Sequence, residues 1–271
     1  MPRSVRKCDS PSTIPGERSR RGWELLQAGD ADGSLACHGE ATSSPTTGPL
    51  NWFHRARSEQ ALGRTDEARA SFTHAVKPVK GHTLPAREGQ EAWFQLASLQ
   101  KAAGLFEESA AAYREVIAMD PTLSGAQIML GVVLRDLGRV EESVDAYTVG
   151  LALNPSVAGA QYNRAQGLLA LGRRAEAADG FEATLRADPK FALAYEALGD
   201  LLADAGQLQR VRGYRPTLRP LSCLTTSPSH LACFSYRYQS HYQPTLRVER
   251  LTHPLSSISR TGTRLPTHPS H

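Results

Sequence analysis

The chain has 271 residues, a net charge of +4 and a hydrophobic content of 40%, close to the average of globular proteins, so we expect a folded core within one or two domains. Its longest apolar run, residues 128–134, is far too short to cross a bilayer, and we expect no membrane partner. The positive net charge comes from residues 209–271, where nine arginines stand against a single acid, which leaves residues 1–208 at −4. We therefore do not interpret the positive total as a nucleic-acid-binding surface, and we expect no nucleic-acid partner.

Residues 1–48 are interpreted as a mostly disordered lead-in. The first 21 residues are basic and lack the apolar stretch of a secretory signal, so the alternative to a disordered lead-in is a transit peptide. Residues 22–39 have an alternative interpretation as a degenerate copy of the repeat described next. Four cysteines are sparse and have no zinc-knuckle spacing, so we expect no disulfide framework, favour a reducing compartment and assign the chain to the cytoplasm.

Three kinds of residue recur every 34 residues in the middle of the chain. They are the glycines Gly104, Gly138, Gly172 and Gly206, the aromatic residues Tyr113, Tyr147 and Phe181, and the prolines Pro121, Pro155 and Pro189, each after Asp or Asn. Apolar residues between them recur at helical spacing. The glycine favours a left-handed turn that ends a first helix, and the Asp/Asn-Pro step ends a second helix, which we place at about 107–119 in one copy. Such a helix pair buries its apolar face only against another pair, so the pattern predicts an all-α array of about nine helices.

The pattern resembles the tetratricopeptide repeat (TPR) family over residues 49–208, about four and a half repeats, with a first repeat around Trp52, Gly63 and Phe72. The interval from Gly63 to Gly104 is 41 residues, and we assign the excess to an inserted loop at 77–90, which is rich in proline and glycine. The resemblance implies a right-handed helical solenoid of stacked antiparallel helix pairs.

The repeat pattern stops in mid-unit at Gln209. The remaining residues, 209–271, are basic, rich in Pro, Ser, Thr and His and free of periodicity, which predicts disorder. Two interpretations stay open for this tail. It is either a functional disordered segment or sequence that is not genuine coding sequence.

The sequence contains no motif for catalysis, metal binding or a cofactor, so we predict that the chain is not an enzyme and has neither a metal site nor a cofactor. In proteins that it resembles, partners bind the concave surface lined by the first helices. Carried over by position in the repeat, the candidate partner-binding groove consists of Phe53, Arg57, Phe94, Ser98, Lys101, Ile128, Val132, Arg135, Tyr162, Asn163, Gln166, Glu196 and Asp200. This groove would be basic at its first repeats and acidic at its last. For the acids of the last helix we favour the alternative of a solubilising cap, which terminal repeats need.

We therefore predict a protein–protein interaction scaffold that binds a peptide or protein segment in the groove. The alternatives are the non-catalytic TPR region of a truncated larger enzyme, of the glycosyltransferase or sulfotransferase type, and a truncated product without function. The lysine and asparagine clamp of chaperone-binding relatives is missing, because the matching positions hold Phe53 with Arg57 and Phe94 with Ser98. The sequence does not indicate an oligomeric state.

Overall fold

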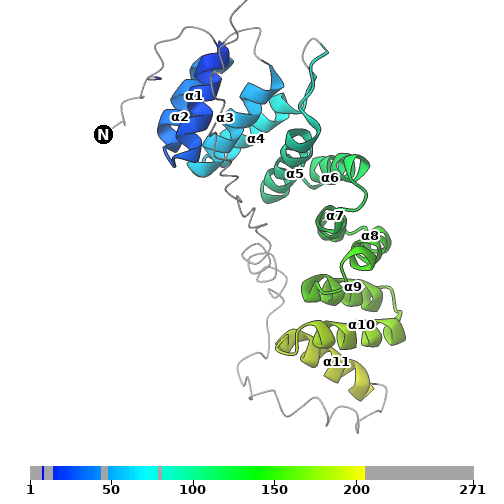
Figure 1. The fold of residues 1–271 in the computed structure, drawn as a ribbon. Helices are drawn as coiled ribbons and strands as arrows, with labels where there is room; N and C mark the ends of the chain where they lie inside the picture. The colour runs from blue at the N-terminus through cyan, green and yellow to red at the C-terminus, as the bar shows by residue number, and fades with distance from the viewer. Residues whose placement is uncertain (1–7, 9–14, 44–47, 79–80, 205–271) are drawn as a thin grey trace, which may run out of the picture. The chain divides into compact units, whose positions relative to one another are not determined.

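The computed structural model describes residue 8 and residues 15–43, 48–78 and 81–204. These residues belong to one compact unit that extends to Leu221, whereas a second unit, Ser222–His271, lies outside the described ranges together with the predicted tail. Eleven helices make up the described part of the chain (Figure 1). They are α1 (Pro15–Gln27), α2 (Ala31–Thr42), α3 (Pro49–Ala61), α4 (Thr65–Ala75), α5 (Ala86–Ala102), α6 (Phe106–Met119), α7 (Ser124–Asp136), α8 (Val140–Leu153), α9 (Ala158–Ala170), α10 (Arg174–Ala187) and α11 (Ala192–Asp204).

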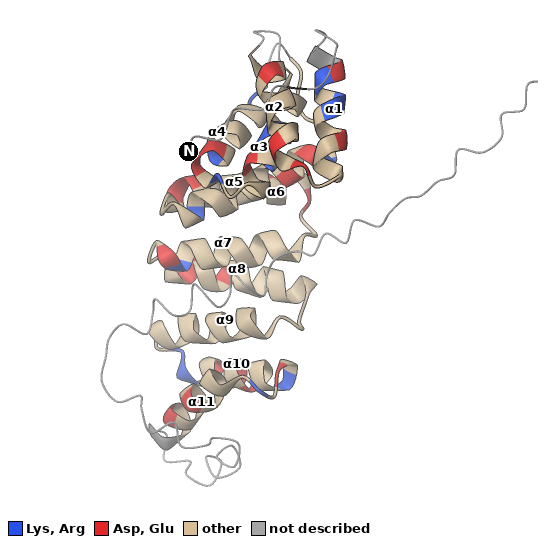
Figure 2. Ribbon diagram, turned by 90° about the vertical axis from the view of Figure 1, so that its left-hand side faces the viewer, with Lys and Arg blue, Asp and Glu red and all other residues tan. Residues whose placement is uncertain are grey.

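The helices pack in consecutive pairs. Each odd-numbered helix from α1 to α9 packs against the helix that follows it, and each pair then contacts the next pair through α2 and α3, α4 and α5, α6 and α7, α8 and α9, or α10 and α11. Figure 2 shows the later helices as successive rows, with the charged residues of α7 and α8 gathered near the turn that joins them. The predicted all-α solenoid is confirmed.

The turn between the helices of a pair follows directly from its glycine. Gly138 has a φ of 77°, a left-handed conformation that suits a residue without Cβ. The N–H of Gly138 then donates to the carbonyl of Arg135, and the N–H of Arg139 donates to the carbonyl of Leu134 at 2.9 Å. These two hydrogen bonds form a Schellman motif, which satisfies carbonyls that the end of a helix leaves free.

The second helices end where the Asp/Asn-Pro steps predict. Asp120 leaves the helix in an extended conformation, and its carboxylate accepts hydrogen bonds from the N–H and the hydroxyl of Thr122. Asn154 makes the same two contacts with Ser156. The helix expected at about 107–119 spans Phe106–Met119, within one residue of the prediction.

A recurring core sits inside each pair. The aromatic residues nine positions after the turn glycines are fully buried: Phe72, Tyr113, Tyr147 and Phe181. The buried hydroxyls of Ser109 and Ser143 donate to the carbonyls of Ala97 and Gly131 on the first helices, each at 2.7 Å. These side chains bind the two helices of a repeat together.

The structure differs from the sequence expectation at the start of the chain and in the inserted segment. Residues 1–48 contain helices α1 and α2, joined by Gly29 with the same left-handed turn, which brings the total above the expected nine helices. The loop that we placed at 77–90 ends earlier, because Pro85 adopts the extended conformation that precedes a helix and α5 begins at Ala86.

The sequence led us to expect no disulfide framework, whereas the structure contains a disulfide near the start of the chain. Cys8 and Cys37 are bonded, with their Cα atoms 4.5 Å apart. The N–H of Cys8 donates to the carboxylate of Glu40, one turn further along α2, which holds the two segments together. A separation of 29 residues between two isolated cysteines carries no signal in the sequence that would reveal this pairing.

Candidate protein-binding surface

Polar side chains connect the first helices of neighbouring repeats. We call the surface formed by α3, α5, α7, α9 and α11 the first-helix face. Three hydrogen bonds run across it from one repeat to the next: Arg57 to Glu91 at 2.6 Å, Gln60 to Gln95 at 2.8 Å and Arg135 to Asn163 at 3.3 Å. The helices of this face are therefore tied together by polar groups as well as by the apolar core.

Several residues of the predicted groove are core residues. Phe53 is 2% exposed and its ring lies edge-on against Phe72 of α4, while Ile128 is fully buried and packs where a Cβ on Gly150 of α8 would lie. For Phe53 and Ile128 the assignment to an accessible groove is wrong, since each points into the interior of its own repeat. Val132 is buried as well.

Tyr162 and Asn163 of α9 are almost completely buried, although both keep polar contacts. The hydroxyl of Tyr162 accepts a hydrogen bond from Gln166 at 2.8 Å, and its ring contacts Phe181 and Phe191. This part of the predicted set contributes to packing between helices more than to an open surface.

The remaining predicted residues reach the surface. Arg57, Phe94, Ser98, Lys101, Arg135 and Gln166 are half-buried, and Glu196 and Asp200 are exposed. Phe94, Ser98 and Lys101 follow one another at four- and three-residue steps, so they lie along one face of α5. The ring of Phe94 packs edge-on against Tyr113, which fixes its orientation.

The charges of the first repeats are largely compensated within the protein. Arg57 forms an ion pair with Glu91, and Arg135 forms one with Asp136 at 2.8 Å. Lys101 has no ion-pair partner within 4.0 Å among the residues that the structure describes. Burial lowers the pKa of the Lys101 ammonium, Asp136 raises it and Arg135 lowers it further. The expected basic groove is thus reduced to one partly desolvated cation.

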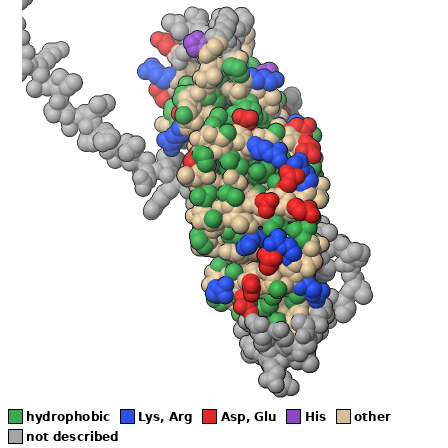
Figure 3. Space-filling model, turned by 90° about the vertical axis from the view of Figure 1, so that its right-hand side faces the viewer, with side chains coloured by type: hydrophobic (Ala, Val, Ile, Leu, Met, Phe, Trp, Pro, Cys, Tyr) green, Lys and Arg blue, Asp and Glu red, His purple; other side chains and the backbone are tan. Residues whose placement is uncertain are grey.

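The opposite face, formed by the second helices, has a different character. Arg139 bridges Glu107 of α6 and Glu142 of α8, and Arg173 pairs with Glu176. Figure 3 shows basic and acidic side chains interspersed on this side of the molecule. Exposed pairs of this kind contribute little to stability, so we assign them to solvation.

The profile of the tetratricopeptide repeat family matches residues 53–124, 94–158 and 162–210. The chain belongs to this family. Three solved structures illustrate the likeness of its TPR fold. MamA protein is 20% identical, with a TM-score of 0.56, and the match covers 66% of this chain and 93% of MamA. YrrB, described as a TPR protein with an unusual peptide-binding site, is 15% identical, with a TM-score of 0.58 and coverages of 66% and 89%.

A MamA fragment from Desulfovibrio magneticus RS-1 is 14% identical, with a TM-score of 0.55 and coverages of 67% and 99%. At these identities the likeness establishes the fold alone. No curated protein matches the sequence.

Residues of the TPR surface that sequence reasoning missed are Gln60, Glu91, Gln95 and Asp136. The period of the repeat does not reveal them. Arg57 and Glu91 are 34 residues apart and Gln60 and Gln95 are 35 residues apart, whereas equivalent positions of these two repeats are 41 residues apart. These contacts between first helices therefore join residues at different positions of the repeat.

Within the described ranges of this TPR chain, no group of three or more His, Cys, Asp or Glu side chains is placed to hold a metal ion. No helix in the same ranges combines the length and apolar character needed to cross a membrane. The surface that remains as a candidate site is the first-helix face.

Proposed function

We propose that this TPR array binds a peptide or an exposed segment of another protein along its first-helix face. The observation that supports the proposal is Lys101, a half-buried cation without an ion-pair partner among the described residues, on the same face of α5 as the half-buried ring of Phe94. Among proteins of similar fold, YrrB is described as having a peptide-binding site. A scaffold that positions partners is also the general use of this family.

The chemistry around Lys101 favours a peptide with a carboxylate. Burial removes part of the hydration of the ammonium, and no carboxylate of the described residues lies within ion-pair distance to replace it. A ligand carboxylate would form a charge-assisted hydrogen bond there, which is stronger than a bond between neutral groups. Phe94 lies on the same face of α5, four residues before Ser98 and seven residues before Lys101. An apolar side chain of the ligand would then lie against the ring of Phe94.

The experiment is a selection of random displayed peptides on the full chain, followed by affinity measurements with fluorescence polarisation. We expect Lys101→Ala to weaken binding of the selected acidic peptides by about 10-fold or more, since hydrogen bonds to charged groups are worth about 1.5–3 kcal/mol. The control is Arg186→Ala, an exposed cation of α10 on a second helix, which should leave the affinity unchanged.

A second comparison identifies the group on the peptide. Replacing its carboxylate by the amide should weaken binding to the wild type but not to the Lys101→Ala variant. Equal affinities of wild type and Lys101→Ala, or an equal loss with Arg186→Ala, would contradict the proposal. Phe94 and Tyr162 are poor choices for this test, because both rings pack against buried aromatic residues and their removal would disturb the fold.

A further inference from the structure

We infer that α1 and α2 form an additional repeat that acid releases from α3, because a histidine occupies its core aromatic position and faces a second histidine across the joint. This inference concerns the N-terminal pair and is independent of the proposed peptide-binding function. It rests on position in the repeat, on packing and on unpartnered buried nitrogen atoms.

The repeat positions of α1 and α2 match those of the array. Gly29 lies 34 residues before Gly63, and both have a positive φ. Nine residues after Gly29 stands His38, at the position of Phe72, Tyr113, Tyr147 and Phe181 in the other repeats. Gly22 stands seven residues before Gly29, the position of Gly131 in the third repeat. The family profile does not extend to this segment, so the pair is a divergent repeat.

The packing of the pair follows the same plan. His38 is fully buried, like the aromatic residues it replaces. A Cβ on Gly22 would come within 2.6 Å of the His38 ring, and a Cβ on Gly131 would come within 2.9 Å of the Tyr147 ring. In both repeats the ring on the second helix therefore lies against a glycine of the first helix.

The rings of the two histidines are stacked against each other. The ring centroids of His38 and His54 are 5.5 Å apart. The ring centroid of Trp23 of α1 lies 4.7 Å from that of His54. Both ring nitrogens of His38 and Nδ1 of His54 are buried and have no hydrogen-bond partner in the part of the chain that the structure describes. A proton on either ring would place a charge in this largely desolvated joint, and two protons would repel each other.

The charged groups near the rings do not compensate such a proton. Burial, and then His54, lower the pKa of His38 to about 3. Burial is also the main cause that lowers the pKa of His54 to about 4; Arg57 of α3 adds to the effect and Glu88 of α5 opposes it. Other charges near the joint form ion pairs with each other, Arg18 of α1 with Glu40 of α2 and Arg55 with Glu59 within α3.

The direction of the pH effect follows from these values. Released from the joint, each imidazole would titrate near its ordinary pKa of 6.5, above its value in the docked state. The released state therefore binds more protons, so docking is fully stable above that pKa and weakens as the pH falls below it.

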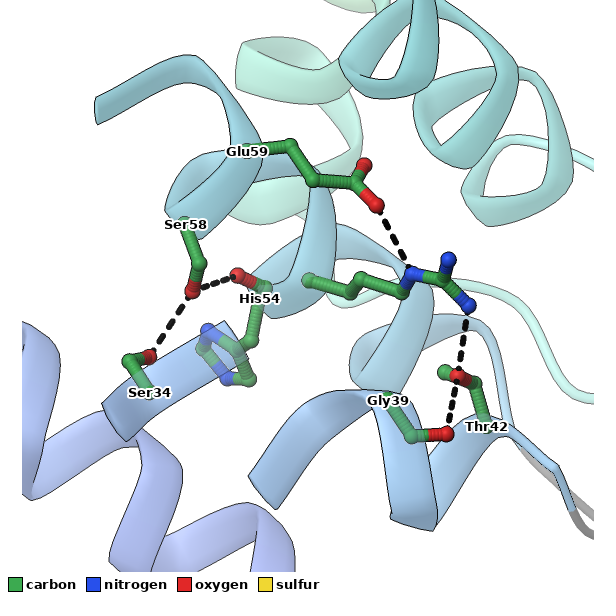
Figure 4. A network of polar contacts seen from close by, with 7 residues as sticks. Ser34, Gly39, Thr42, His54, Ser58 and Glu59 are labelled. Atoms are coloured by element: carbon green, nitrogen blue, oxygen red, sulfur yellow. Dashed lines mark hydrogen bonds and ion pairs between the residues drawn. The ribbon is translucent and has the colours of Figure 1, made fainter. Parts of the chain in front are cut away.

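Hydrogen bonds also join α2 to α3 (Figure 4). Ser34 and Ser58 share a hydrogen bond of 2.8 Å and Arg55 donates to Thr42, while Ser58 also donates to the carbonyl of His54 within α3. The disulfide joins residue 8 to α2 and so does not hold the N-terminal pair on α3. Release of the pair therefore breaks no covalent bond.

Hydrogen exchange followed by mass spectrometry on the full chain tests this inference. Exchange is measured at pH 7 and pH 5 and corrected for the intrinsic effect of pH on the exchange rate. At pH 5, protonation of each histidine in the released state should lower the hydrogen-exchange protection of residues 15–42 by about 30-fold relative to pH 7. Protonation of both should lower it by about 1,000-fold. Residues 124–187 should keep their protection.

Variants separate titration from simple loss of packing. His38→Tyr restores the aromatic type found at Tyr147 and should remove about 30-fold of the pH effect. His54→Gln introduces the residue that Gln95 provides at the same position of the next repeat, and it should remove a similar factor even if the first variant packs poorly. The control is His74→Gln, an exposed histidine on α4, which should leave the pH effect unchanged.

Three results would overturn the inference. They are equal corrected protection of residues 15–42 at the two pH values, an unchanged pH effect in His54→Gln, and an equal loss of protection in residues 124–187. The last would indicate that acid unfolds the whole array.

Discussion

Replacing both members of the ion pair Arg55–Glu59 by leucine should leave the protein as stable as the wild type or more stable, whereas Arg55→Leu alone should destabilise it. The pair links the side chains of α3 at 2.8 Å, next to the α2 joint (Figure 4). Counted from the turn glycine, Arg55 occupies the position of Leu96, Leu130 and Leu198, and Glu59 occupies that of Leu134, Leu168 and Leu202. Two leucines would therefore introduce the residue that most other repeats carry at these positions.

The magnitudes follow from the unequal burial of the partners. Glu59 is 2% exposed, and one of its carboxylate oxygens already lacks a hydrogen-bond partner, whereas the Arg55 side chain is 32% exposed. Removing Arg55 leaves a buried, unpaired carboxylate, which should lower the free energy of unfolding by about 3 kcal/mol. This value is the lower end of the range for buried ion pairs, because water reaches the arginine side of the contact. Removing Glu59 leaves an arginine that can turn toward water, and we expect a loss of about 1 kcal/mol. The double substitution should range from neutral to about 2 kcal/mol more stable.

The assay is urea unfolding of the full chain followed by circular dichroism at 222 nm, with the free energy of unfolding determined for the wild type, both single variants and the double variant. The difference between the double effect and the sum of the single effects is the coupling energy, which should exceed about 2 kcal/mol. The matched control is the half-exposed pair Arg173–Glu176, for which we expect no measurable coupling. Additive effects at Arg55 and Glu59, or a double variant less stable than Arg55→Leu, would refute the reasoning.

Two further substitutions test the turns and the disulfide. Gly138→Ala should lower the free energy of unfolding by about 1–2 kcal/mol, because a residue with Cβ is disfavoured at a φ of 77°. Gly199→Ala in α11, where the new methyl group meets open space, should instead raise the free energy of unfolding by up to about 1 kcal/mol. Urea unfolding measures both changes, and equal effects of the two substitutions would contradict this account. Cys37→Ser should destabilise the α1–α2 pair by at most about 3–4 kcal/mol, the chain-entropy value for a closed loop of this length. Reduction with dithiothreitol should lower the hydrogen-exchange protection of residues 15–42 in the wild type but not in the variant.

The boundaries of the helices in the array were predictable because the residues that set them act locally. A glycine that adopts a left-handed turn and an Asp/Asn-Pro step that stops a helix need no information about the rest of the fold, so α6 lies within one residue of its expected position. The pair α1–α2 escaped clear prediction because it lacks both the aromatic residue and the Asp/Asn-Pro step. His38 at the aromatic position looks like a lone polar residue until it is counted from Gly29.

The candidate surface was only partly predictable for a different reason. Repeat position indicates which side of a helix a residue occupies, but it does not indicate how closely the neighbouring helix approaches. Phe53 and Ile128 share the position of Phe94, yet they are buried while Phe94 stays half-buried. Likewise, the sequence did not reveal that the arginines of the first-helix face are paired. Their acidic partners lie on the first helix of the next repeat or at the adjacent residue.

The lengthened interval between the first two repeats of the array has a practical consequence. Gly63 and Gly104 are 41 residues apart, yet α4 and α5 still pack together, because the extra residues lie in the connection before Pro85 and in the first turn of α5. The number of residues in this connection can therefore vary without changing the contacts between α4 and α5. An affinity tag or a dye attached between α4 and α5 should therefore report on the protein without altering its repeats.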